Sequence, residues 1–567
     1  MMVSELLTSE QVKLKSIEKL QGLGLTENQI LSVLKSSGFQ YILKNSRIRS
    51  NSRIFDFENR IQTGTNLFSS ITTKNSYLEI AIKIPQLFLL SPIRIHKNII
   101  NIVESFSKYG LTVDSYIDAI IKHPFLVGHN SNTIIFNIVK ITDNFNKDGL
   151  KTENYISAGL NQPVLFILKA ETIIDNIDTI VSELKGYGLT KEKYLHIAIK
   201  QPALFFRKSN DILDSIKGVV EYFKNNGLTV SEYIQLFIKQ PSIFTQTKET
   251  ILKHVQELIN EFAPYGLNIN KYYFALIKQP QLFYQSSQTI INNIKGVVNY
   301  FSNYGLTLAD YIKSALRQPP LFCMSPETVI QNITNLVNKF PILLTVENYL
   351  QAALRSPSLF YQSAETIFLN ISNVVERLEK NELTIDRYLK AVLKNTALFY
   401  MSPQTIISNL TRVAERFEDK GLTLTKYVQA ALKQPPLFSQ SPETIIAHIN
   451  LLLALHKDNI IAIKPSKKIS IIDQLLKRPI VLSFSDDNIE LRKYYVRILN
   501  RNPSVNILSL TRATLEKALF NFFSFDIKDT TKSFDLSKDT LDEFEHQAQA
   551  KRWAVRGLIK GDILTTP

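Results

Sequence analysis

The sequence predicts an all-α fold, an α-solenoid of about twelve 39-residue two-helix repeats with degenerate capping units at its ends. Two observations support this prediction: a short motif recurs with a fixed period, and each copy holds two helical patterns without the period-two alternation of strands. The motif, here called the anchor, is a proline followed by an apolar–aromatic pair. It recurs at Pro85, Pro124, Pro163, Pro202, Pro241, Pro280, Pro319, Pro357 and Pro435, and Thr396 replaces the proline in one copy. Every step is 39 residues except the 38 between Pro319 and Pro357.

Each repeat is predicted to contain two helices. Residues 325–340 begin with Ser325, a good N-cap, and Pro326, which suits the first helical position. Apolar residues then recur at helical spacing, and in most copies a glycine such as Gly305 ends the first helix. The second helix begins at the threonine of a Gly-Leu-Thr motif, as at Thr307. It ends at the anchor proline, which cannot continue a helix.

The regular repeats are predicted to occupy residues 73–457. Residues 1–72 are expected to hold an N-terminal capping repeat and a linker, and residues 458–567 a degenerate repeat and a C-terminal helical cap. Degenerate ends suit a solenoid, because a terminal repeat must expose a polar outer face.

Composition and charge narrow the function. The formal net charge of +15 and the pI near 9.4 indicate an anionic partner, most often nucleic acid. Cys323 is the single cysteine, which excludes a disulfide framework and a cysteine-based metal cluster. The sequence holds no phosphate-binding glycine loop, HExxH motif or nucleophile elbow, so we expect no enzyme, no cofactor and no metal site. No signal peptide or membrane span is visible, so we expect a cytoplasmic monomer without membrane contact. The alternative location is a host cell or an organelle.

The position two before the anchor is basic in nine of the ten copies. This basic column consists of Lys83, Lys122, Lys200, Lys239, Lys278, Arg317, Arg355, Lys394 and Lys433, and Lys477 continues it into the degenerate repeat. The residue four earlier is polar or variable, as in Asp118, Gln235 and Lys313, which indicates the solvent face of the second helix. The column is predicted to contact nucleic-acid phosphates. The alternative is that each cation only complements the dipole at the end of its helix.

Two further columns are predicted to be structural. A tyrosine eight before the anchor occurs in all ten regular copies. We expect it in the core with its hydroxyl bonded locally, and stacking on bases is the alternative. An asparagine thirteen after the anchor occurs in seven copies. Asn332 and Asn370 are therefore expected to be largely buried and bonded to backbone groups in or next to their own repeat.

The most variable positions lie four and five after the anchor. Tyr361 and Gln362 can stack on and hydrogen-bond a base, whereas Leu89 and Leu90 cannot. This variable pair is therefore either a base-reading surface or an unconstrained exposed turn. The candidate base-reading residues are Arg207, Gln246, Tyr284, Gln285, Tyr361, Gln362, Tyr400 and Gln440.

The order Pro-x-Leu-Phe, Ser, Ile-x-x-Asn-Ile, Gly-Leu-Thr and a second helix back to proline resembles the mitochondrial transcription termination factor (mTERF) family, over roughly residues 73–500. Residues 475–499, LLKRPIVLSFSDDNIELRKYYVRIL, are especially similar to that family's C-terminal units. The resemblance implies a curved helical-repeat protein whose basic concave face binds double-stranded DNA or, in some members, RNA. We therefore expect a non-enzymatic nucleic-acid-binding solenoid that favours DNA over RNA and regulates transcription. The alternative is a protein-interaction solenoid, such as a bacterial effector that docks on a host protein.

Overall fold

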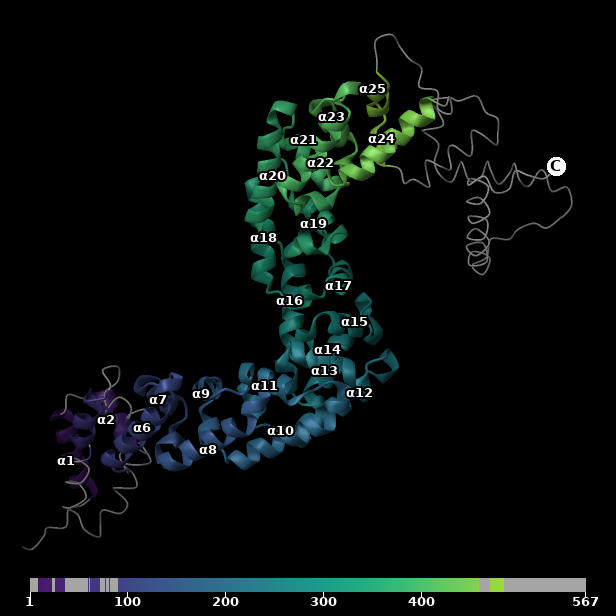
Figure 1. Ribbon diagram of the computed structural model, residues 1–567. Helices are drawn as coiled ribbons and strands as arrows, with labels where there is room; N and C mark the ends of the chain where they lie inside the picture. The colour runs from purple at the N-terminus through teal and green to yellow at the C-terminus, as the bar shows by residue number, and fades with distance from the viewer. Residues whose placement is uncertain are drawn as a thin grey trace, which may run out of the picture. The chain divides into compact units, whose positions relative to one another are not determined.

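The computed structural model describes residues 9–22, 26–35, 60, 62–71, 77, 81, 90–457 and 470–483, which contain α-helices and short 3₁₀ helices and no strand (Figure 1). The all-α prediction is thereby confirmed. The chain divides into two compact units, residues 1–341 with 345–364 and residues 342–344 with 365–567. The predicted domain limits at residues 72/73 and 457/458 fall at or beside residues outside the described ones, so that division stays a prediction.

Pairs of helices repeat along the first unit. Its N-terminal pair is α1 (Ser9–Gly22) and α2 (Glu27–Lys35). The first helices of the later pairs are α6 (Pro92–Phe106), α8 (Ser131–Phe145), α10 (Ala170–Leu184), α12 (Ser209–Tyr222), α14 (Lys248–Phe262), α16 (Ser287–Phe301) and α18 (Pro326–Lys339). The second helices are α7 (Val113–Lys122), α9 (Thr152–Asn161), α11 (Lys191–Lys200), α13 (Val230–Lys239), α15 (Ile269–Lys278), α17 (Leu308–Arg317) and α19 (Val346–Arg355). Successive first helices contact one another, so that α6, α8, α10 and α12 form one row and α7, α9, α11 and α13 the other (Figure 1).

The second unit continues the same pattern. Its pairs are α20 (Ala364–Leu378) with α21 (Ile385–Lys394) and α22 (Pro403–Arg416) with α23 (Leu424–Lys433), followed by α24 (Pro442–Lys457) and α25 (Ile471–Leu476). Helix α25 is followed by the 3₁₀ turn Pro479–Ser483, which packs against α24. The degenerate repeat predicted near the C-terminus therefore keeps the second helix and the proline turn of a regular repeat.

Local sequence fixes both ends of each helix. The Thr229 hydroxyl accepts a hydrogen bond from the Glu232 backbone N–H, and the Glu232 carboxylate accepts one from the Thr229 N–H. Before this cap the chain turns through Gly227 with a φ of 91°, a left-handed conformation that favours glycine. Each anchor within the described residues opens a 3₁₀ turn, such as Pro319–Phe322. Glycine turns and proline turns therefore lie at opposite ends of the helices, here called the glycine edge and the proline edge.

The single 38-residue step has a local cause. Most repeats place a 3₁₀ turn and a glycine between their two helices, but α18 and α19 are joined without either, through residues 340–345. Ile342 takes a φ of 78° there and is 99% exposed, which is an unfavourable conformation for a β-branched residue. One strained turn therefore absorbs the missing residue, and α19 has the same length as the other second helices of the regular repeats.

The tyrosine column packs between repeats. All ten tyrosines are at most 2% exposed, which confirms that they belong to the core. Tyr155 meets Phe205 in the proline turn of the next repeat edge-on, with ring centroids 5.3 Å apart, and Tyr311 meets Phe360 in the same way at 5.3 Å. The hydroxyls that donate to a leucine carbonyl of their own repeat are those of Tyr155, Tyr194 and Tyr349. The prediction of a local hydrogen bond is wrong for five tyrosines, whose hydroxyls have no partner among the described residues: Tyr233, Tyr272, Tyr311, Tyr388 and Tyr427.

The asparagine column also joins neighbouring repeats. Asn98 Nδ2 donates to the His129 carbonyl oxygen at 3.1 Å, and Asn370 Nδ2 donates to the Phe399 carbonyl oxygen at 3.5 Å. Bonding to the backbone of the next repeat is therefore confirmed at these two positions. The prediction of deep burial is wrong for Asn332 and Asn370, which are half-buried, because this position lies at the margin of the apolar stripe. Asn332 makes no side-chain hydrogen bond to another described residue.

Two tyrosine-to-phenylalanine substitutions separate packing from hydrogen bonding in the column. Tyr194→Phe removes a hydroxyl that donates to the Leu204 carbonyl at 2.9 Å, so we expect the local free energy of unfolding to fall by about 1 kcal/mol. Tyr272→Phe removes a hydroxyl without a partner among the described residues and keeps the edge-on contact with Phe322, so we expect no loss. Native-state hydrogen exchange in the flanking helices measures both changes. Equal losses would show that the hydrogen bond does not distinguish the two positions.

Candidate nucleic-acid interface

The basic column lies at the proline edge, where each second helix ends. Its described members are all exposed: Lys122, Lys200, Lys239, Lys278, Arg317 and Arg355 in the first unit, and Lys394, Lys433 and Lys477 in the second. Lys83 lies outside the described residues. Second helices contact their neighbours within each unit, as α9 does α11 and α21 does α23. The fold therefore places column members of the same unit on neighbouring helices.

Two members of the column bond the end of the next second helix. Lys122 Nζ donates to the Leu160 carbonyl oxygen at 3.3 Å. The Arg317 guanidinium donates to the carbonyl oxygens of Leu354 at 3.1 Å and of Arg355 at 2.9 Å. These carbonyls belong to the last turn of a helix, so both cations complement a helix end. Within the part of the chain that the structure describes, Lys200, Lys239, Lys278, Lys394, Lys433 and Lys477 make no side-chain hydrogen bond or ion pair.

Three positions share the exposed face of each second helix, because residues at i, i+3 and i+7 lie on one side of a helix. In α15 they are Lys271, Phe274 and Lys278, all exposed. In α21 they are Arg387, Lys390 and Lys394, also all exposed. The second-helix face, defined by these three positions in every pair, therefore carries more cations than the basic column alone. Sequence reasoning recognised this face as solvent-exposed but assigned no contact to its other two positions.

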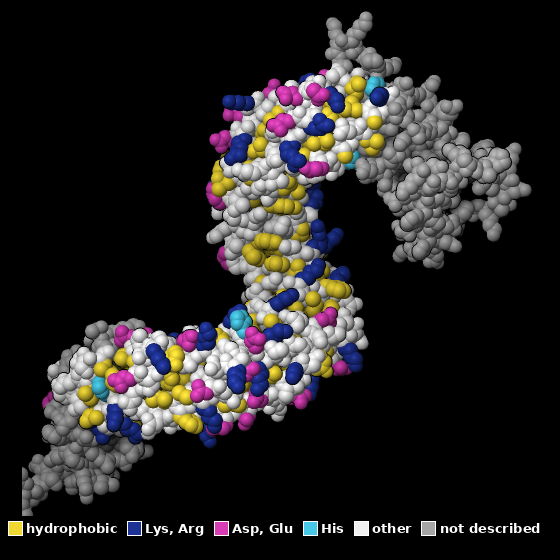
Figure 2. All heavy atoms as spheres, in the orientation of Figure 1, with side chains coloured by type: hydrophobic (Ala, Val, Ile, Leu, Met, Phe, Trp, Pro, Cys, Tyr) yellow, Lys and Arg dark blue, Asp and Glu magenta, His cyan; other side chains and the backbone are white. Residues whose placement is uncertain are grey.

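Several cations of the first-helix row are paired with carboxylates of neighbouring first helices, whereas Arg94, Lys217 and Arg377 have no such partner among the described residues. The ion pairs are Lys140–Glu171 between α8 and α10, Lys295–Glu261 between α16 and α14, and Arg412–Glu443 between α22 and α24. On the second helices α17 and α19, Lys and Arg side chains gather, as the dark blue spheres in Figure 2 show. Both rows therefore hold paired and unpaired cations. On the second-helix face Lys390 and Lys426 are paired with carboxylates, while Lys200, Lys239 and Lys278 of the basic column have no such partner among the described residues.

The variable pair follows each proline turn and packs against neighbouring repeats. The Arg207 guanidinium is half-buried and donates to the carbonyl oxygens of Phe244 and, at 2.9 Å, Gln246. Gln240 Nε2 donates to the Tyr284 hydroxyl at 2.9 Å. Other half-buried members are Gln246, Gln285, Tyr361, Gln362 and Gln440, while Tyr400 is 42% exposed. Several polar groups of the variable pair thus form hydrogen bonds between repeats. The role of the variable pair in base reading stays a prediction.

The described residues offer no group of His, Cys, Asp and Glu side chains that could hold a metal ion. Burial raises the pKa of the Cys323 thiol to about 12, so this side chain is protonated at neutral pH. None of the described helices is long and apolar enough to cross a membrane.

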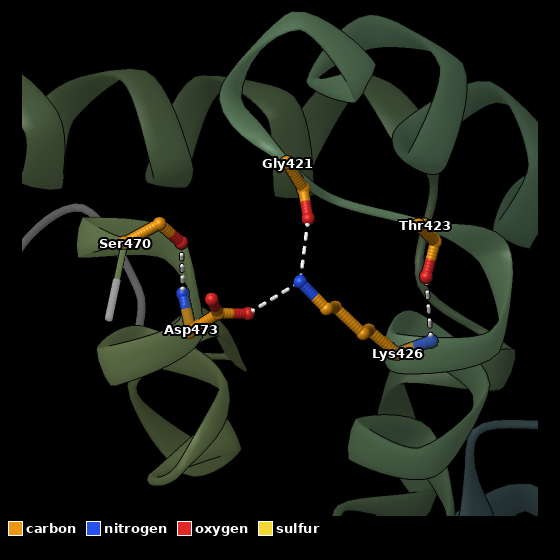
Figure 3. A network of polar contacts seen from close by, with 5 residues as sticks. All are labelled: Gly421, Thr423, Lys426, Ser470 and Asp473. Carbon is orange, nitrogen blue, oxygen red and sulfur yellow. Dashed lines mark hydrogen bonds and ion pairs between the residues drawn. The ribbon is translucent and has the colours of Figure 1, made fainter. Parts of the chain in front are cut away.

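One cation of the second-helix face holds the degenerate repeat in place. Lys426 Nζ, in α23, donates to the Gly421 carbonyl oxygen at 2.9 Å and pairs with Asp473 Oδ1, in α25, at 2.8 Å (Figure 3). Asp473 is fixed in turn by its backbone N–H, which donates to the Ser470 hydroxyl at 3.0 Å. The hydrogen bond from the Lys426 ammonium lowers the pKa of the Asp473 carboxyl below its usual value. Lys426 therefore connects a glycine turn of the regular repeats to α25.

The ion pair makes the packing of α25 dependent on pH. A carboxyl whose pKa falls on folding stabilises the folded state above its unfolded pKa of about 3.9, and the contribution is lost as pH drops through the folded value. Asp473→Asn should therefore reduce hydrogen-exchange protection of α25 at pH 7, by no more than about 1 kcal/mol because the pair is partly exposed. The difference from the unsubstituted protein should shrink as pH approaches 3. Asp386→Asn is the control, because Asp386 pairs with Lys390 inside α21 and should leave α25 unchanged.

Comparison with known proteins gives a match to one protein family. No curated protein matches the chain. Residues 136–349 match the mTERF family, and this segment runs from within α8 into α19. It includes Lys200, Lys239, Lys278 and Arg317 of the basic column. Proteins of the mTERF family are non-catalytic and bind nucleic acids. The predicted resemblance is confirmed, and residues 136–349 of this chain are an mTERF family domain.

Proposed function

We propose that this protein binds duplex DNA in preference to RNA through its second-helix face, and that it regulates transcription by occupying its site. The observation that carries the proposal is the basic column, which places an exposed cation on successive second helices. Lys200, Lys239 and Lys278 have no carboxylate partner among the described residues, unlike cations such as Lys295, which pairs with Glu261. Phosphates compete for unpaired cations without first breaking an ion pair.

The repeated spacing also supports a polyanion as the partner. A nucleic-acid backbone presents phosphates at regular intervals, and a stack of repeats presents cations at regular intervals. The other role of the column, at helix ends, accounts for Lys122 and Arg317, which bond carbonyl oxygens of the next helix. It does not account for Lys200, Lys239 and Lys278, whose side chains make no such bond with the described residues. The column thus combines a structural role at some positions with phosphate contacts at others.

The salt dependence of binding tests this proposal. On duplex DNA the logarithm of the binding constant should fall with the logarithm of salt concentration, with a slope near −0.9 per neutralised phosphate. The triple variant Lys200→Gln, Lys239→Gln, Lys278→Gln should bind more weakly to all sequences and flatten the slope by up to about three. The measurement is a fluorescence-anisotropy titration at several salt concentrations, with RNA duplex of the same sequence as the competing ligand.

A second triple variant provides the matched control. Lys140→Gln, Lys253→Gln, Lys295→Gln removes the same charge from the first-helix row, where all three lysines face carboxylates. We expect a much smaller change of slope for this variant. Equal changes in both variants would mean that net charge, and not the second-helix face, determines binding. The absence of salt-dependent binding to DNA and RNA at low ionic strength would favour the alternative of a protein-docking solenoid.

A further inference from the structure

One position of the second-helix face differs from the others because its residue type changes from repeat to repeat. It lies six residues before the anchor. The basic column lies on one side of it, and the position on the other side holds Asn154, Lys193, Glu232, Lys271, Asp310 and Asn348 in α9 to α19. In the first unit its members on α9 to α19 are Ser157, His196, Gln235, Phe274, Lys313 and Gln351, here called the central column. All six are exposed, and Phe274 is 64% exposed. No side chain of the six makes a hydrogen bond or ion pair with another residue that the structure describes.

The neighbouring positions have structural duties that the central column lacks. Lys193, three before His196, donates to the Gly188 carbonyl oxygen at 3.0 Å, and Lys271, three before Phe274, donates to the Gly266 carbonyl oxygen at 2.8 Å. These lysines brace the glycine turns. The six side chains of the central column therefore have no polar partner among the described residues, and Phe274 contacts the ring of Tyr273. At the same position of the second unit, Lys390 pairs with Asp386 and Gln429 Nε2 donates to the Glu382 carbonyl oxygen at 3.5 Å.

We propose that the central column reads base edges of the DNA bound on the second-helix face, one residue per repeat. This inference rests on the proposed function and names the residues that give it sequence preference. Phosphates are chemically uniform along a strand, and the neighbouring basic column, which is cationic in five of these six repeats, suits them. Bases differ from one position to the next. A column of hydroxyl, imidazole, amide, phenyl and ammonium groups suits such a varied ligand.

Helix geometry places the central column where bases would lie. In α15, Lys271 and Lys278 each lie about one helical turn from Phe274. In α13 and α17 a cation of the basic column lies on one side of the central residue, and Glu232 or Asp310 lies on the other. Neighbouring second helices pack at roughly 8–10 Å. Base pairs stack at about 3.4 Å, so each repeat spans about three base pairs. Each central residue should therefore influence a separate short segment of the DNA.

The residue types imply different base preferences. Gln235 and Gln351 each carry a donor and an acceptor, which match the N6 and N7 atoms of adenine. Lys313 carries only donors, which match the O6 and N7 acceptors of guanine. Phe274 offers an apolar surface that suits the methyl group of thymine. The variable pair is less suited to this role, since Arg207 and Tyr284 already bond neighbouring repeats.

Exchange of residue types within the column tests the inference. The full-length protein and its variants are each used to select binding sites from a pool of random DNA duplexes. Lys313→Gln should change the preferred base at one site position from guanine toward adenine, by several-fold to about a hundred-fold, and leave the other positions unchanged. Gln235→Lys should produce the reverse change at a different position. Lys278→Gln, in the basic column, is the matched control and should weaken binding to every sequence without changing the selected sites.

The outcomes separate this inference from the proposed function. If the variants and the unsubstituted protein select the same sites while binding remains salt-dependent, the central column is not a reading surface and the phosphate-contact proposal stands. The same conclusion follows if binding is salt-dependent but no sequence is enriched from the random pool. If the protein shows no salt-dependent binding to duplex DNA, both proposals are wrong.

Discussion

The contact on which the rest of the structure depends is the one between the buried tyrosine of one repeat and the phenylalanine in the next repeat's proline turn. In pairs such as Tyr155–Phe205 and Tyr388–Phe438 the ring centroids lie 5.3 Å apart, and the rings meet edge-on. A repeat alone cannot bury this tyrosine, because the surface that covers it belongs to its successor. Stability therefore arises between repeats as much as within them. The same contact sets how far each second helix is turned relative to the next, and so decides which residues share an exposed face.

This dependence explains why the two rows of helices differ in charge. On the first-helix row, lysines reach carboxylates of the neighbouring repeat, as Lys140 reaches Glu171. On the second-helix face, Lys390 and Lys426 are also paired, but Lys200, Lys239 and Lys278 on successive helices have no such partner among the described residues. Like charges on neighbouring helices repel one another, which lowers the stability of the free protein. An anionic ligand relieves this repulsion. Unpaired cations on neighbouring helices thus lower the stability of the free protein and strengthen the binding of an anion. This is a reason to expect the ligand on the second-helix face and not on the first-helix row.

Much of the fold could be predicted because it repeats. Caps such as Thr229, glycine turns such as Gly227 and the proline turns are local signals, and their recurrence in most copies reinforces each one. Partners across repeats could not be predicted in the same way. Arg207 was a candidate for base contact on its chemistry, but its guanidinium bonds carbonyl oxygens of the next repeat, 37 and 39 residues away. The sequence also could not tell Tyr194, whose hydroxyl is bonded, from Tyr272, whose hydroxyl has no partner among the described residues. Small differences in backbone position decide such bonds, and the motif is the same in both repeats.

Separation of stability from recognition follows from this architecture. The tyrosine and the proline turn hold each repeat on its successor, while the central residue of the second-helix face, such as Gln235 or Lys313, makes no hydrogen bond or ion pair with any described side chain. Exposed residues of this kind are usually exchanged at a cost within about 0.5 kcal/mol. A change of residue type there leaves the core and the flanking cations in place. Repeats can therefore differ at this exposed position while keeping the tyrosine that packs each repeat on its successor. The chain shows this combination, because its ten tyrosines are invariant and its central residues range from serine to phenylalanine.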